Sequence, residues 1–196
     1  MNRAWANQIA LKFWWRKYVA RITKAFWVAR AKKDAEYLLP YLPEGGRIID
    51  IGAGSGTVSL VLSEKARAHF TLADVIDWNV TQLPLVLFDG EHLPFADKEF
   101  DAAMLVDVLH HSEKERQLMQ EALRVAKRVV VLEVVLENPL IQLWEDVFDN
   151  LQWLLYGMPV GIHHRNKKQW VEFLKVFSPR VQYFQAFGRH SIFVVE

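Results

Sequence analysis

Three glycines at alternate positions follow an acidic residue in the stretch Asp50-Ile51-Gly52-Ala53-Gly54-Ser55-Gly56. Glycine adopts left-handed backbone angles at no steric cost and lets a ligand approach the main chain closely, and a following helix offers free N–H donors. An acid that ends an apolar strand and leads into this loop indicates a cradle for a nucleotide cofactor. A purely structural turn explains the glycines about as well, so residues further along must separate the two interpretations.

Acidic residues also end the next apolar stretches. Asp74 ends the stretch from His69 to Ala73, about 20 residues after the glycine loop, where an acid suits the diol of a ribose. A dehydrogenase of the dinucleotide-binding class would show G-x-G-x-x-G, whereas these glycines alternate. Each acid has a structural alternative, as a helix cap or a turn residue.

The block from Phe88 to Asp101 (FDGEHLPFADKEFD) precedes an apolar strand, Ala102 to Val106, and then Asp107-Val108-Leu109-His110-His111. Together with the glycine loop, these motifs resemble the class I S-adenosylmethionine (SAM)-dependent methyltransferases of type 11, in the same order and spacing. The resemblance covers about residues 46 to 137 and disfavours a dehydrogenase.

The resemblance implies how SAM, and its product S-adenosylhomocysteine (SAH), would bind. The glycine loop would pass under the methionine moiety, and Asp50 would hold the amino group directly or through water. Asp74 would accept hydrogen bonds from the ribose hydroxyls, Asp89 would meet the adenine edge, and the segment around Asp107 would close over the sulfonium. Carboxylates at strand ends suit such a cationic ligand. The predicted cofactor-binding residues are Asp50, Gly52, Ala53, Gly54, Gly56, Asp74, Val75, Asp89, Gly90 and Asp107.

Methyl transfer needs a base only if the acceptor must lose a proton, and His110 and His111 are the candidates because histidine titrates near neutral pH. The alternative is that this pair only positions its loop. Glu133 ends a strand on the same edge and suits either a polar acceptor group or a structural role. The predicted substrate residues are Glu133, Trp153, Tyr156, His163 and His164. No metal is expected, since the chain has no H-E-x-x-H motif and no cysteine.

Apolar runs alternate with helical stretches between Glu44 and Pro139, which predicts an α/β fold with a doubly wound sheet. The family resemblance implies a Rossmann-like sheet of seven strands, mostly parallel, with helices on both faces and a C-terminal antiparallel hairpin at residues 181–186 and 191–195. Only about ten residues separate Asp74 from the next strand, so the helix there must be shortened. Trp78 would then cover adenine or pack on the sheet edge.

Residues 1–33 contain nine Lys or Arg and no acid, and their apolar residues follow helical spacing. We expect an amphipathic helix at residues 1–34 that packs on the catalytic domain and closes the cleft. The alternative is peripheral attachment to an anionic membrane surface. Nucleic acid is a weaker alternative, since no RNA-binding motif accompanies the basic residues.

Residues 35–196 are expected to form one domain, in which 138–177 is a helical insertion on the substrate side. The chain has no cysteine and no apolar run long enough to span a bilayer, which favours the cytoplasm, with the inner membrane surface as the peripheral alternative. The predicted function is SAM-dependent O- or C-methylation of a small or lipid-like acceptor. The alternative is a non-catalytic SAM-binding or interaction module. The oligomeric state is not determined by the sequence.

Overall fold

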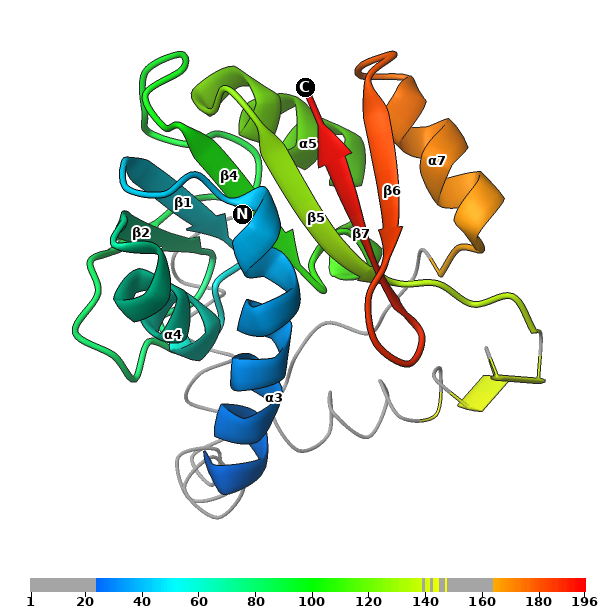
Figure 1. The fold of residues 1–196 in the computed structure, drawn as a ribbon. Coiled ribbons are helices and arrows are strands. Elements are labelled where there is room, and N and C mark those ends of the chain that lie inside the picture. Colours follow the sequence, from blue (N-terminus) through cyan, green and yellow to red (C-terminus); the bar gives the residue numbers. More distant parts are fainter. Residues whose placement is uncertain (1–23, 139, 142, 145–146, 148–163) are drawn as a thin grey trace.

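The computed structural model describes residues 24–138, 140–141, 143–144, 147 and 164–196 (Figure 1). A seven-stranded sheet with the order β3-β2-β1-β4-β5-β7-β6 forms its centre. Strands β1 to β5 pair in parallel, while β7 is antiparallel to both β5 and β6, as predicted. The strands are β1 (Arg47–Ile51), β2 (His69–Asp74), β3 (Leu85–Leu87), β4 (Ala102–Val106), β5 (Val129–Val134), β6 (Val181–Gln185) and β7 (His190–Val195).

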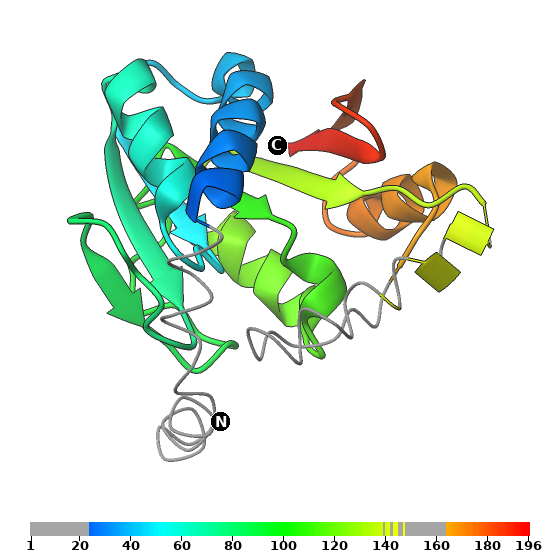
Figure 2. The ribbon, with the colours of Figure 1, turned by 90° about the horizontal axis from the view of Figure 1, so that it is seen from below.

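Helices cover both faces of the sheet (Figure 2), as predicted. Both faces of the central strands are buried, so β1, β4 and β5 are mostly apolar, with Asp50 and Glu133 as buried exceptions. The helices α3 and α4 pack on one face, and α5 and α7 pack on the other. The helices are α3 (Lys24–Leu38), α4 (Thr57–Ala66), α5 (Glu115–Val125) and α7 (Lys167–Lys175), with short 3-10 turns η1 (Leu39–Tyr41) and η2 (Leu109–His111).

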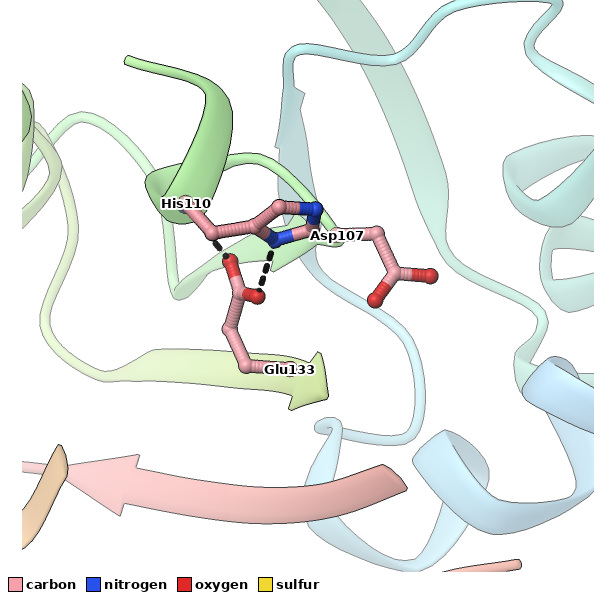
Figure 3. Close-up of side chains that lie close together, drawn as sticks. All are labelled: Asp107, His110 and Glu133. Carbon is pink, nitrogen blue, oxygen red and sulfur yellow. Dashed lines mark hydrogen bonds and ion pairs between the residues drawn. The ribbon is translucent and has the colours of Figure 1, made fainter. Parts of the chain in front are cut away.

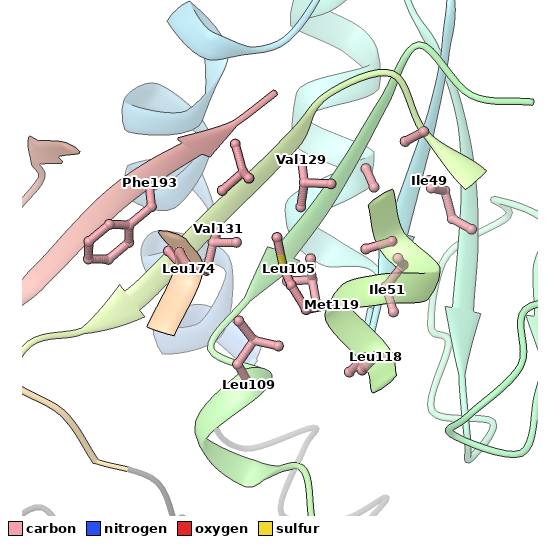
Figure 4. Close-up of a cluster of buried hydrophobic side chains, with 14 of the residues drawn as sticks. Ile49, Ile51, Leu105, Leu109, Leu118, Met119, Val129, Val131, Leu174 and Phe193 are labelled. Carbon is pink, nitrogen blue, oxygen red and sulfur yellow. The ribbon is translucent and has the colours of Figure 1, made fainter. Parts of the chain in front are cut away.

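The larger core cluster lies between the sheet and the helices α5 and α7 (Figure 4). Ile49 of β1 and Val131 of β5 meet Met119 of α5 and Leu174 of α7 in this layer. The next residue along β1, Ile48, faces the opposite cluster. Strands β1 and β4 are neighbours in the sheet. After β1 the chain passes through α4 to β2, and after β4 it passes through α5 to β5 on the opposite side, so the two connections diverge at the carboxyl ends of β1 and β4. Ligands of open α/β sheets bind at such a switch point.

The connection between β2 and β3 contains no helix, so the shortened helix that we expected there is replaced by a loop. Asn79 organises this loop, since its Nδ2 donates to the Leu83 carbonyl at 2.9 Å and its Oδ1 accepts from the Thr81 N–H at 2.8 Å. Val80 N–H donates to the Ser55 carbonyl at 3.1 Å. The loop is therefore a support for the glycine loop.

Helix α3 is continuous across the boundary that we predicted between residues 34 and 35. Its buried residues are Ala31, Asp34, Ala35 and Leu38, whereas Phe26 from the predicted apolar stripe is 60% exposed. Residues 1–23 lie outside the described part of the chain, as does half of the predicted insertion at 138–177. The membrane and nucleic acid alternatives for residues 1–33 therefore stay predictions. Among the described residues, no helix has the length and apolarity to cross a membrane.

Candidate active site

All three loop glycines adopt left-handed backbone angles, with φ of 75° at Gly52, 53° at Gly54 and 72° at Gly56. A Cβ on Gly52 would lie 2.6 Å from the side chain of Val108, and one on Gly56 would lie 2.7 Å from that of Leu72. A Cβ on Gly54 would meet no atom within 4 Å. The first and last glycines are thus required by packing, whereas Gly54 faces open space that a ligand can enter.

Two buried carboxylates flank this loop. Asp74 ends β2 and accepts hydrogen bonds from the Gly54 N–H at 2.8 Å and the Ile76 N–H at 3.1 Å. Asp50 lies within β1, and its Oδ2 accepts from the Ser59 hydroxyl of α4 at 2.6 Å. Burial raises the pKa of Asp50 to about 7, although the Ser59 hydrogen bond works to lower it. Asp50 therefore changes charge near neutral pH.

Asp89 and Gly90 begin the loop after β3. The Asp89 carboxylate accepts the backbone N–H groups of Glu91 at 2.8 Å and of His92 at 2.7 Å. The hydrogen bond from His92 N–H is the main cause that lowers the pKa of Asp89 to about 2. Gly90 has φ of 87°, and a Cβ there would lie 3.2 Å from Val75. Asp89 thus closes the turn that begins this loop, and Gly90 lies beside Val75.

Glu133 of β5 lies between the sheet and the turn η2 with no exposed surface. Its Oε1 accepts the backbone N–H groups of Val108 at 3.1 Å and Leu109 at 2.7 Å, and its Oε2 lies 2.5 Å from Nδ1 of the buried His110 (Figure 3). A carboxylate accepts, so Nδ1 of the imidazole carries the proton and Nε2 has a lone pair in the neutral ring. This contact favours the structural role that we left open for Glu133, because the chain's own donors occupy both its oxygens.

Asp107 follows β4 with a left-handed φ of 53° and joins three elements. Its carboxylate forms an ion pair with Arg30 of α3 and lies beside His190 at the start of β7, whose Nε2 is 3.3 Å from Oδ1. Burial works to raise the pKa of Asp107, but the contacts with His190 and Arg30 outweigh burial and hold the pKa well below its ordinary value. Asp107 is therefore an anion at the carboxyl edge of the sheet.

The remaining predicted histidines and aromatic residues are only partly described. His111 and His164 both lie beside His110, with ring centroids 3.9 Å and 5.5 Å from its ring. Trp153, Tyr156 and His163 lie outside the described residues, so their assignment to the substrate stays a prediction. Of the predicted substrate residues after β5, His164 thus lies next to His110.

Asp107, His110 and Glu133 offer three ligand atoms within 4.8 Å of one another, so we considered a metal ion. The Arg30 guanidinium already neutralises Asp107, and both Glu133 oxygens accept N–H groups of the protein. A cation would have to displace these donors. The arrangement is that of a hydrogen-bonded network, and the sequence-based prediction that no metal is used is unchanged.

Arg30, Asp34 and His190 also lie at this edge of the sheet, and no sequence motif marks them. Arg30 is one of nine basic residues in the first 33 and follows no motif, while His190 lies 160 positions away from it in the chain. Only the docking of α3 against β7 brings them together. No local pattern could have identified them.

The strand order of the sheet, with β7 antiparallel and a glycine loop after β1, is the architecture of class I methyltransferases. Residues 49–132 match the family model described as Methyltransferase domain, type 11. A SAM-dependent methyltransferase from Thermotoga maritima superimposes with a TM-score of 0.68 at 16% identity, covering 92% of this chain and 97% of that one.

Two curated relatives are similar in sequence. A demethylmenaquinone methyltransferase of Paenarthrobacter aurescens is 27% identical over 59% of this chain and 47% of its own length. A tRNA (carboxymethyluridine(34)-5-O)-methyltransferase of Schizosaccharomyces pombe is 31% identical over 45% of this chain and 41% of its own length. The chain thus spans about half the length of the curated relatives it matches. Residues 49–132 thus match a methyltransferase-domain model, and the described fold is that of the superimposed SAM-dependent methyltransferase.

Proposed function

We propose that the protein is a SAM-dependent methyltransferase that methylates a small or lipid-like acceptor. The observation that carries this proposal is the open space at Gly54, bounded by the buried carboxylate of Asp74 and the chain's left-handed glycines. A cationic ligand with hydroxyl donors suits this position, because the carboxylates supply the acceptors that such a ligand needs.

The residues present fit SAM. Asp74 would accept the ribose hydroxyls with the lone pairs that its backbone contacts leave open. The Gly90 backbone, beside Val75, would meet the adenine edge with Asp89. Asp107 has a buried Oδ1 that accepts no hydrogen bond of good geometry among the described residues, and with Asp50, through water, it would hold the ammonium group. When bound, SAM supplies a sulfonium methyl group for in-line displacement.

The protein's contribution to transfer is to position the acceptor and to accept its proton. Placement of two reactants in line supplies much of the rate of such a displacement. Nε2 of His110 would take the proton from an acidic hydroxyl or carbon, and Glu133 would hold the ring in the tautomer that makes Nε2 the acceptor. His111 and His164 lie against this ring and would border the acceptor.

A lipid-like acceptor is supported by the described residues of the segment after β5. Leu140, Leu143, Trp144 and Val147 are each more than half exposed. Such a run of exposed apolar side chains suits contact with an apolar molecule. The relative named a demethylmenaquinone methyltransferase supports a quinone-like ring with an acidic position as the first acceptor to test.

The proposal is tested by incubating the protein with methyl-labelled SAM and a panel of demethylated quinones, phenols, lipids and unmodified tRNA. We expect label in a quinone or phenol product. Label in tRNA alone would overturn the proposed acceptor class. Binding of SAH without transfer to any acceptor would favour the non-catalytic module, and failure to bind SAM or SAH would overturn the function as a whole.

Substitution of Gly54 separates ligand contact from backbone strain. Both Gly54→Ala and Gly45→Ala place a side chain at left-handed angles with no atom within 4 Å, so each is expected to cost about 1 kcal/mol of stability. Only Gly54→Ala should weaken SAH binding, by tenfold or more, since its methyl group enters the crevice. Thermal unfolding and calorimetric titration measure both effects, and equal SAH affinities of the two variants would exclude Gly54 from the site.

The charge of Asp50 predicts how cofactor binding depends on pH. With a pKa of about 7, Asp50 is ionised at pH 8 and protonated at pH 6, so affinity for the ammonium-bearing SAH should fall about tenfold between these values. Asp50→Asn should bind weakly and with little pH dependence between them. A wild-type affinity that does not change between pH 8 and pH 6 would contradict a role for Asp50 in binding.

The same pKa shift also acts on stability without ligand. Because the folded state binds the proton more tightly than the unfolded state, the buried carboxylate costs stability progressively as the pH rises from about 4 to 7. Asp50→Asn should therefore raise the melting temperature relative to wild type more at pH 8 than at pH 5. Thermal unfolding at the two pH values measures this difference.

A further inference from the structure

Arg30 is a partly buried guanidinium at the carboxyl edge of the sheet. Its Nε donates to Asp34 at 3.4 Å, and its Nη2 contacts both Asp107 and the His190 Nε2, the latter at 2.9 Å. Its side chain is 27% exposed, and its Nη1 makes no hydrogen bond within the part of the chain that the structure describes. The guanidinium thus keeps donors that no described residue uses.

A chain of contacts connects Arg30 to the glycine loop. Arg30 forms an ion pair with Asp107. Val108, which follows Asp107 in the chain, packs so closely on Gly52 that a Cβ on Gly52 would overlap the Val108 side chain. Strands β1 and β4 are paired neighbours that end together at this edge. Figure 1 shows the dark blue N-terminal half of α3 extending past the end of β1. The ion pair with Asp107 thus puts Arg30 at the carboxyl end of β4, next to β1, whereas Asp74 ends β2 and Asp89 follows β3.

The proposed ligand carries two opposite charges at its methionine end, an ammonium and a carboxylate. Asp50, Asp74, Asp89 and Asp107, which we predicted for the cofactor, are all acids and would repel the carboxylate. A desolvated anion needs a cation as partner, and the Nη1 of Arg30 still has N–H donors for a charge-assisted hydrogen bond to a carboxylate. The crevice therefore requires a basic side chain beside its acids, and Arg30 stands next to Asp107.

We propose that Arg30 binds the carboxylate of the methionine end of SAM, an assignment that rests on the proposed function. Asp34 accepts a hydrogen bond from the guanidinium Nε, and Asp107 pairs with its Nη2, so these two carboxylates fix the position of Arg30. The left-handed backbone of Asp107 is consistent with this role, because strained conformations persist where a site requires them. The N-terminal helix thereby becomes part of the cofactor site and recognises its amino-acid end.

The test is a cycle of two ligands and three proteins, measured by calorimetric titration. The ligands are SAH and its decarboxylated analogue 5′-(3-aminopropylthio)-5′-deoxyadenosine, which keeps the amine. The proteins are the wild type, Arg30→Gln, and Lys33→Gln, which removes the same charge one turn further along α3. Arg30→Gln should lose roughly 10- to 100-fold in affinity for SAH, the effect of one charged hydrogen-bonded pair. It should bind the decarboxylated analogue as well as the wild type does, and Lys33→Gln should bind both ligands normally.

Each outcome decides the assignment. Undiminished SAH affinity in Arg30→Gln overturns it. Equal losses for both ligands mean that Arg30 only supports the fold, which also overturns it. Arg30→Lys should bind SAH more tightly than Arg30→Gln does. If Arg30→Lys binds SAH no better and also binds the decarboxylated analogue weakly, Arg30 has a structural role and the assignment is wrong. A wild type that binds neither ligand refutes the proposed function instead.

Discussion

An Asp74→Asn variant is expected to bind SAH at least about 100-fold more weakly than the wild type, since two charge-assisted hydrogen bonds to the ribose would be lost. The loss has a second cause. The Asp74 carboxylate accepts the Gly54 N–H at 2.8 Å and the Ile76 N–H at 3.1 Å, so an amide that turns its NH₂ group toward either donor disturbs the glycine loop. Calorimetric titration of both proteins measures the change.

Asp101→Asn is the matched control for this variant. Asp101 also accepts a backbone hydrogen bond, from the Arg47 N–H at 2.9 Å, and a lysine contact from Lys127 at 2.8 Å. It precedes β4, at the opposite edge of the sheet from Asp74. The control should lose the same charge and keep its SAH affinity. Equal affinities of the Asp74 and Asp101 variants would remove Asp74 from the cofactor site.

The second large effect is expected at the contact between His110 and Glu133. If His110 accepts the acceptor's proton, His110→Gln should lower turnover by roughly 10²- to 10⁴-fold, the usual contribution of a general base. Binding of SAH should change little, because the imidazole contacts Glu133 and not the glycine loop. Steady-state rates with the labelled acceptor measure turnover, and calorimetric titration measures SAH binding.

Glu133→Gln tests whether the carboxylate positions the ring. A glutamine Oε1 can still accept the Leu109 N–H, now at 2.7 Å from the carboxylate, so η2 should keep its place. The amide NH₂ then faces Nδ1 and favours the opposite tautomer, with the proton on Nε2. Turnover should fall nearly as far as in His110→Gln, with SAH affinity retained.

An exposed histidine controls for the change of residue type. His92→Gln, on the loop after β3, should turn over at nearly the wild-type rate. Full activity in His110→Gln would assign the base to another group or show that none is needed. A large loss of SAH affinity in Glu133→Gln would mean that Glu133 acts through the fold.

Local patterns in the sequence were sufficient for most of the architecture. The seven strands, the antiparallel hairpin and the helices on both faces follow from apolar runs and their spacing together with the family motifs. The same patterns located the glycine loop, Asp50 and Asp74, because a strand, a tight turn and a helix in succession fix these residues relative to one another. The relative positions of residues a few places apart in the chain can be predicted without knowing how the rest of the chain folds.

The sequence misjudged the connection between β2 and β3. A shortened helix was the expectation. Instead, the Asn79 side chain donates to the Leu83 carbonyl and accepts from the Thr81 N–H, and these hydrogen bonds take the place of the backbone hydrogen bonds of a helix. Asparagine and threonine side chains compete with the backbone in this way. The outcome depends on side-chain geometry that composition and spacing do not specify.

The sequence by itself determined where the glycine loop, Asp50, Asp74 and Asp107 lie, at or next to the carboxyl ends of β1, β2 and β4. Only the tertiary structure decided their partners, since Glu133 meets His110 across β4 and β5, and Arg30 meets Asp107 and His190 across α3, β4 and β7. These contacts join residues from 23 to 160 positions apart. The physical reason is that a motif records local conformation, whereas an ion pair or hydrogen bond between distant residues exists only after the sheet and its helices have packed.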